Sequence, residues 1–179
     1  MQYSIKNLLF GAAALAAVAA ANSVTFQNQD SVTRTIVFTG SENMASPENF
    51  VLEGHGITKV EFPTGWIGNW YAVSEGADNV PGMLGEVTFD AFNGITFFDI
   101  SAIVNPDDVN NVKMLYPANL ELPTSGCQDF PCANAYNKWD DVQTQATADH
   151  DLVCLLGTLE AQPEPERRLR RGSRKDSAN

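Results

Sequence analysis

The chain has few cysteines and histidines, the residues that most often hold zinc and other transition metals. Three of its 179 residues are cysteine and two are histidine. Cys127, Cys132 and Cys154 form no paired C-x-x-C units, and His55 and His150 stand singly. A structural zinc site takes four Cys or His ligands in closely spaced pairs. The sequence therefore predicts neither a metal site nor any other cofactor.

Basic residues are scarce through most of the chain. Between Asn22 and Glu160 there are four Lys and Arg against 19 Asp and Glu, a formal net charge of −15. A body this acidic repels nucleic-acid phosphates and anionic membrane surfaces, so neither is expected as a partner. No Gly-rich phosphate loop or Ser-His-Asp pattern occurs. The composition suits a soluble extracellular protein, which we expect to be a monomer.

Only one long apolar run is present, from Leu8 to Ala21. At about 14 residues it falls short of the roughly 20 that cross a bilayer. A short polar start with one lysine precedes it, and A-x-A cleavage frames end it. This arrangement predicts a secretory signal peptide at residues 1–21, and so export to the extracellular space or the cell wall.

The C-terminal segment, residues 161–179, contrasts with the acidic body. It holds six of the chain's 11 basic residues, two prolines and little apolar content, so we expect a disordered basic tail. Its two dibasic pairs leave proteolytic processing open as an alternative. Residues 22–160 remain as the folded unit, which is enough chain for one domain but not for two.

Sustained helical periodicity is also missing. Short alternating segments rich in Val, Thr, Ile and Phe recur instead, among them "SVTFQNQ", "TRTIVFTG", "ITKVEFP" and "GEVTFDAF", with turn residues between them. "DHDLVCLLG" is expected to be a terminal strand. Many short strands separated by frequent turns predict an all-β fold, a β-sandwich with a single domain.

One segment, "ITFFDISAIV", carries Asp99 in an otherwise apolar strand. Burying an unpaired carboxylate costs several kcal/mol, or the group takes a proton. Asp99 and its partners are therefore the first candidates for a site.

Three motifs together resemble the thaumatin-like proteins, in particular small, cysteine-poor, secreted fungal ones. Glu86 in "MLGEVTF" and Asp99 in "FFDISAIV" fall on that family's strand glutamate and its (Y/W)-D-(I/V)-S aspartate. "SGCQDFPC" resembles a G-C-x4-C pair. "CANAYNKWDD" resembles C-P-x-A-Y-x-x-x-D-D and contains Asp140 and Asp141. The family's 16 cysteines and its cleft arginine are missing here, and Val104 stands where another aspartate is expected.

The resemblance implies a thaumatin-like β-sandwich with an acidic cleft that binds β-glucan. On this reading the chain binds a cell-wall polysaccharide or a host surface without catalysis. A weak glucan hydrolase using Glu86 and Asp99 is the enzymatic alternative, and an effector or adhesin that recognises a host protein is the other. The candidate ligand-binding residues are Glu86, Asp99, Asp140, Asp141, Trp70 and Tyr71.

Purely structural roles remain open for the same residues. Glu86 and Asp99 could bond backbone amides, and the tryptophans of "GWIGNWYAV" could pack the core rather than stack on sugar rings.

Three cysteines in an exported chain indicate one disulfide and one spare thiol. A Cys127–Cys132 bond would close a tight loop, whereas a bond to Cys154 would close a longer one and stabilise more, by about 3 kcal/mol. The resemblance favours Cys127–Cys154, with Cys132–Cys154 as the alternative.

Overall fold

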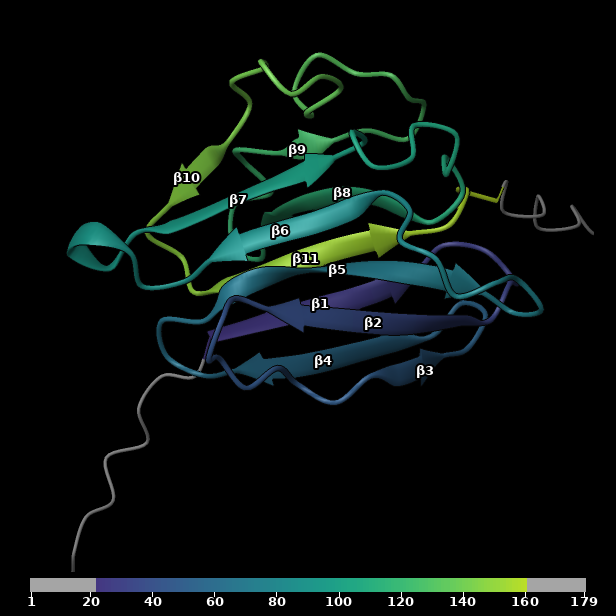
Figure 1. Cartoon of the computed structure of the whole chain (residues 1–179), viewed down its shortest axis with the longest axis horizontal. Helices are drawn as coiled ribbons and strands as arrows, with labels where there is room; N and C mark the ends of the chain where they lie inside the picture. The colour runs from purple at the N-terminus through teal and green to yellow at the C-terminus, as the bar shows by residue number, and fades with distance from the viewer. Residues whose placement is uncertain (1–21, 161–179) are drawn as a thin grey trace, which may run out of the picture.

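The structure is a computed structural model that describes residues 22–160. The predicted signal peptide at 1–21 and the predicted tail at 161–179 lie outside the described residues. Two β-sheets pack face to face, as Figure 1 shows, and this confirms an all-β sandwich. Within the described part of the chain, no helix has the length and apolar character that crossing a bilayer requires.

The first sheet has five strands, and the start and end of the described chain meet at its centre. In spatial order its strands are β4 (Ile57–Phe62), β1 (Asn22–Asn28), β11 (Asp151–Leu156), β8 (Val112–Pro117) and β9 (Ser125–Gly126). The β1–β11 pairing is parallel and the others are antiparallel. The predicted terminal strand is therefore present as β11, clamped between β1 and β8.

The second sheet has six strands, all paired antiparallel. In spatial order they are β10 (Gln145–Thr147), β7 (Thr96–Ser101), β6 (Leu84–Thr88), β5 (Ile67–Ser74), β2 (Arg34–Gly40) and β3 (Phe50–Leu52). A single 3-10 turn, η1 (Phe92–Gly94), joins β6 to β7. Since the pairs follow the order of the chain from β5 to β7, residues close in sequence end up side by side on one face.

Aromatic side chains fill the space between the two sheets. Phe26 on β1 packs edge-on against Phe38 and Trp70 of the opposite sheet, with ring centroids 5.8 and 5.4 Å apart. Each buried ring of this kind contributes about 1.5–3 kcal/mol through removal of apolar surface from water. Because successive side chains of a strand point to opposite faces of the sheet, these residues face the core and their neighbours in sequence face outward.

Trp70 belongs to this core, which corrects one sequence prediction. Its side chain is fully buried and packs over Gly85 of the neighbouring strand, where a β-carbon would lie 2.5 Å from the indole ring. The expectation that Trp70 binds a ligand is therefore wrong, because the indole points between the sheets.

The disulfide also differs from the prediction. The structure joins Cys127 to Cys132, with their Cα atoms 6.2 Å apart, and leaves Cys154 as a buried free thiol on β11. Neither Cys127–Cys154 nor Cys132–Cys154 is formed. Cys154 faces the core between the sheets, and burial raises the pKa of its thiol to about 12, so the reactive thiolate is suppressed.

Peptide mass mapping of the unreduced protein should therefore recover Cys127 and Cys132 in one linked species and Cys154 unmodified. Replacing both linked cysteines with serine should lower the free energy of unfolding by no more than about 2 kcal/mol, because the bond closes a short loop. Urea denaturation of the serine variant and the parent protein measures this difference. A peptide linked through Cys154 would contradict the pairing.

The charged side chain of Arg34 lies deep in the sandwich. Arg34, 1% exposed, points inward from β2 and forms a two-pronged ion pair with Asp30, at 2.6 and 2.9 Å. Its remaining N–H groups donate to Asn28 and Asn111 side chains and to two backbone carbonyls. Asp30 in turn accepts the backbone N–H of Thr158, so this network ties β2 to the segment after β11.

Candidate functional site

The candidate site lies on the outer face of the six-stranded sheet. Strand pairing places Asn69 of β5 opposite Glu86 of β6, and Glu86 opposite Asp99 of β7. Alternation explains the position of Asp99: its neighbours Phe98 and Ile100 face the core, so the side chain between them points outward. The charge in an apolar strand is thus a side chain of the outer face.

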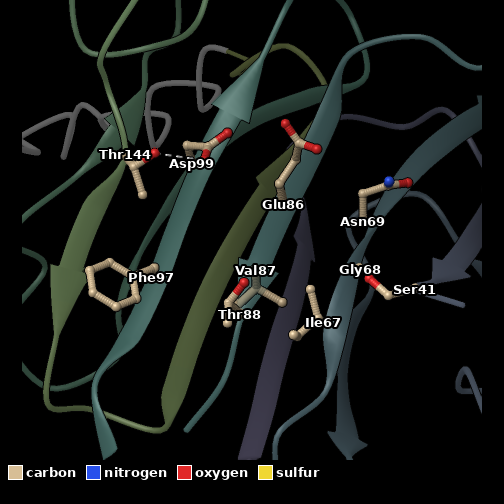
Figure 2. Close-up of a pocket in the computed structure, with 10 residues that line it drawn as sticks. All are labelled: Ser41, Ile67, Gly68, Asn69, Glu86, Val87, Thr88, Phe97, Asp99 and Thr144. Carbon is tan, nitrogen blue, oxygen red and sulfur yellow. Dashed lines mark hydrogen bonds between the residues drawn. The ribbon is translucent and has the colours of Figure 1, made fainter. Parts of the chain in front are cut away.

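These side chains line a groove of about 330 Å³, shown in Figure 2. Asn69, Glu86 and Asp99 form one row across the sheet, and Thr144, just before β10, ends it. The groove is lined by Ser41, Ile67, Gly68, Asn69, Glu86, Val87, Thr88, Phe97, Asp99 and Thr144.

The two carboxyl groups interact directly. The pKa of Asp99 is raised to about 7, first by burial and then by the neighbouring Glu86 carboxyl, while the Thr144 hydroxyl acts in the opposite direction. Burial also raises the pKa of Glu86, while the neighbouring Asp99 carboxyl acts in the opposite direction. Two neighbouring carboxyls that cannot both ionise easily behave as one pair sharing a proton.

The spacing of two carboxyls decides whether they can serve glycoside hydrolysis. Hydrolases hold their two carboxyls at least about 5 Å apart, so that a sugar carbon or a water fits between them. Glu86 and Asp99 lie directly opposite each other on neighbouring strands, where Cβ atoms are about 4.5–5.5 Å apart, so their charges interact strongly. With its proton retained the pair carries one negative charge; without it the pair carries two and is a strong site for a positively charged group.

The other predicted ligand-binding residues do not line the groove. Asp140 is exposed, and Asp141 accepts the backbone N–H groups of Asn137 and Lys138, both at 2.8 Å, which lower its pKa. Tyr71 is 8% exposed and donates its hydroxyl to Asn79 at 2.9 Å. Asp141 and Tyr71 therefore have local structural partners, and the structure brings only Glu86 and Asp99 of the predicted set together.

In residues 22–160, no group of three or more His, Cys, Asp or Glu is placed to hold a metal ion.

A feature that the sequence patterns did not predict is the loop from Asn137 to Asp141 and on to Thr144, the residue by which it reaches the groove. Trp139 and Val142 are 86% and 87% exposed there. The backbone bonds to Asp141 fix one side of the loop, and Thr144, hydrogen-bonded to the Tyr136 hydroxyl at 2.8 Å, fixes the other. The motif comparison used the aspartates of "KWDD" and passed over the tryptophan that precedes them.

Comparison with known proteins finds a relative in sequence and similar folds among solved structures. The antigenic protein SchS21 of Stachybotrys chartarum is 53% identical over 135 residues, which cover 75% of this chain and 94% of that protein. The crystal structure of the protein elicitor MoHrip2 from Magnaporthe oryzae aligns with a TM-score of 0.55 and 16% identity, covering 77% of this chain and all of the other. At that identity the likeness shows the fold alone. No family model matches the chain.

These findings correct the family prediction. Neither relative is a thaumatin-like protein by name, and no family model supports that assignment, so the resemblance is wrong as a statement of family. The motifs that carried it are short: a glutamate and an aspartate opposite each other on an outer face need only strand alternation. The β-glucan ligand that the resemblance implied loses its support as well.

Proposed function

The chain belongs to the family of the antigenic protein SchS21, and from this premise we propose that it is a secreted effector of the elicitor type, recognised by a protein of a host organism. Three observations support this proposal. The relative is named for being antigenic, a protein of the same fold is named as an elicitor, and the N-terminal sequence has the build of a signal peptide.

The observation that carries the recognition surface is the exposed tryptophan of the loop that leads to Thr144. Trp139 stands almost fully in solvent on a loop whose ends are fixed by hydrogen bonds. Tryptophan is among the residues that contribute most to protein–protein binding, and a fixed loop loses little conformational entropy on binding. Trp139 and Val142 together offer a preformed apolar anchor to a host protein.

We expect Trp139→Ala to reduce the host response strongly while leaving the fold intact. The purified secreted protein, applied to leaf tissue in increasing dose, should trigger an oxidative burst. The variant should need at least a tenfold higher dose, as for an anchor residue worth ~1.4 kcal/mol or more. Its free energy of unfolding should change by less than about 0.5 kcal/mol, because the side chain is exposed.

Ile57→Ala is the matched control, since Ile57 is also exposed, at 67%, but lies on β4 of the other sheet. This variant should trigger the oxidative burst at the same dose as the parent protein. Absence of any response to the parent protein, combined with its retention on insoluble β-1,3-glucan, chitin or cellulose, would overturn the effector proposal in favour of polysaccharide binding.

A further inference from the structure

The acid pair in the groove lacks a positively charged partner. Among residues 22–160, the ion pairs join Arg34 to Asp30, Lys59 to Asp151, and two histidines to other acids. The buried Lys113 donates to the Gln128 carbonyl, away from the groove. No basic side chain of this part of the chain pairs with Glu86 or Asp99, although buried carboxylates are ordinarily paired.

Asp99 also has an oxygen with unused bonding capacity. The residue is 9% exposed, and its Oδ1 atom is buried without a hydrogen-bond donor. Its Oδ2 atom receives only one long bond, from the Thr144 hydroxyl at 3.5 Å. The weakly bonded Oδ2 atom and the Glu86 carboxyl therefore have acceptor capacity left for a donor group that enters the groove.

The walls of the groove suit a long side chain with a charged end. Ile67 and Phe97, 40% and 38% exposed, lie two residues along their strands from Asn69 and Asp99. That separation is about 7 Å along a strand, and Figure 2 shows these apolar side chains on the same open face as the carboxyls. Lysine and arginine place an apolar stem on such a surface while the charged head reaches beyond it.

We propose that the groove receives the side chain of a lysine or arginine from a partner polypeptide, with the stem on Phe97 and Ile67 and the head on Glu86 and Asp99. Arginine suits it best, because its fork of five donors matches two carboxyls and the nearby oxygens of Asn69 and Thr144. This inference rests on the proposed function and specifies the partner: a host protein that presents a basic segment. The charge of −15 on the body steers such a segment toward the protein.

The occupancy should depend on pH. Among the described residues, the side chains that face the pair from the other strands and loops lining the groove are Ser41, Asn69, Thr88 and Thr144, none of which titrates near neutral pH. The shared proton of Glu86 and Asp99 is therefore the group that changes. Because it competes with the incoming cation, binding should strengthen as pH rises from 5 to 8.

The test uses the full secreted chain and two short peptides, acetyl-Gly-Arg-Gly-amide and the same peptide with citrulline, which keeps the shape of arginine without its charge. We expect the arginine peptide to shift the amide NMR signals of Asn69, Glu86 and Asp99, with millimolar affinity at pH 8 and at least tenfold weaker affinity at pH 5. The citrulline peptide should bind at least tenfold more weakly than the arginine peptide at pH 8.

Glu86→Gln should weaken binding of the arginine peptide at least tenfold. Glu61→Gln makes the same change of charge on exposed β4 and should keep the affinity of the parent. Equal binding of the two peptides, or equal loss in both variants, would overturn the proposal. If binding appears only after Arg167, Arg168, Arg170 and Arg171 are replaced by glutamine, the chain's own basic segment fills the groove, and the assignment to a partner is wrong.

The host-response assay separates this inference from the proposed function. A response that depends on Trp139 but not on Glu86 would contradict the cation-binding role of the groove and still support the effector function. Loss of response in both Trp139→Ala and Glu86→Gln, with Ile57→Ala and Glu61→Gln unaffected, would support both.

Discussion

Replacing Arg34 with methionine should lower the free energy of unfolding by about 3–5 kcal/mol, the largest stability effect we expect of any single substitution in this chain. Methionine keeps much of the volume but removes every donor. Asp30, 6% exposed, then stays buried without its partner, and the Asn28 and Asn111 oxygens lose their donors. The penalty is the cost of this uncompensated charge, rather than the net worth of the ion pair.

Urea denaturation at pH 7 measures this effect. Lys59→Met is the matched control, because Lys59 pairs with Asp151 at 3.1 Å but both side chains are about half exposed; it should cost less than about 1 kcal/mol. The double variant Asp30→Asn/Arg34→Met should lose less stability than the sum of the losses in its single variants, because Asp30→Asn removes the charge that Arg34→Met leaves without a partner. A loss below about 1 kcal/mol for Arg34→Met would contradict the role given to this network.

The second large effect is a loss of stability as pH rises toward neutrality. Folding raises the pKa of Asp99 from 3.8 to about 7, mainly through burial and then through the charge of Glu86. Between these two values the folded protein binds more protons than the unfolded chain, so the free energy of unfolding falls with increasing pH. The loss of stability caused by ionising Asp99 is absent below about pH 4 and complete above about pH 7.

A shift of this size corresponds to about 2–4 kcal/mol, taking into account that the proton is shared with Glu86 and that the groove is open to water. Carboxyls with lowered pKa values, among them Asp30 and Asp151, act in the opposite direction, but only at pH values near and below 3.8. Stability should therefore be greatest at about pH 4–5 and decline toward pH 8.

Urea denaturation from pH 4.5 to 8.5 tests this slope. Glu86→Gln should flatten the curve and make the protein more stable than the parent at pH 8, since a neutral neighbour no longer opposes ionisation of Asp99. Glu61→Gln should keep the slope of the parent. A parent protein whose stability rises steadily to pH 8 would show that the two carboxyls do not share a proton.

Much of the fold could be predicted from the alternation of apolar and polar residues along the strands. The strands that were not predicted have a physical reason in common. The segments that became β1, β2, β4 and β6 alternate over several residues and were predicted, and the more apolar segments that became β7 and β11 were also expected to be strands. β3, β9 and β10 are two or three residues long, too short to show a period, and form because a longer strand beside them offers bonding groups.

The candidate site was predictable in part. Glu86 and Asp99 stood out because a charge in an apolar strand needs a reason, whereas their pairing across two strands required the register. Arg34 was missed although it shares the inward parity of Ile36 and Phe38, and that parity is the signal that could have revealed it. The disulfide was mispredicted since three cysteines allow three pairings, and the apolar surroundings of Cys154 on β11 were not weighed.

The most direct test of the site is a pH titration of the side-chain carboxyl ¹³C NMR signals of Glu86 and Asp99 in the parent protein. A proton-sharing pair should titrate in two coupled steps, the upper one near pH 7, and the arginine peptide should move that step to lower pH. Two independent titrations near pH 4, unchanged by the peptide, would contradict both the shared proton and the cation-receiving groove.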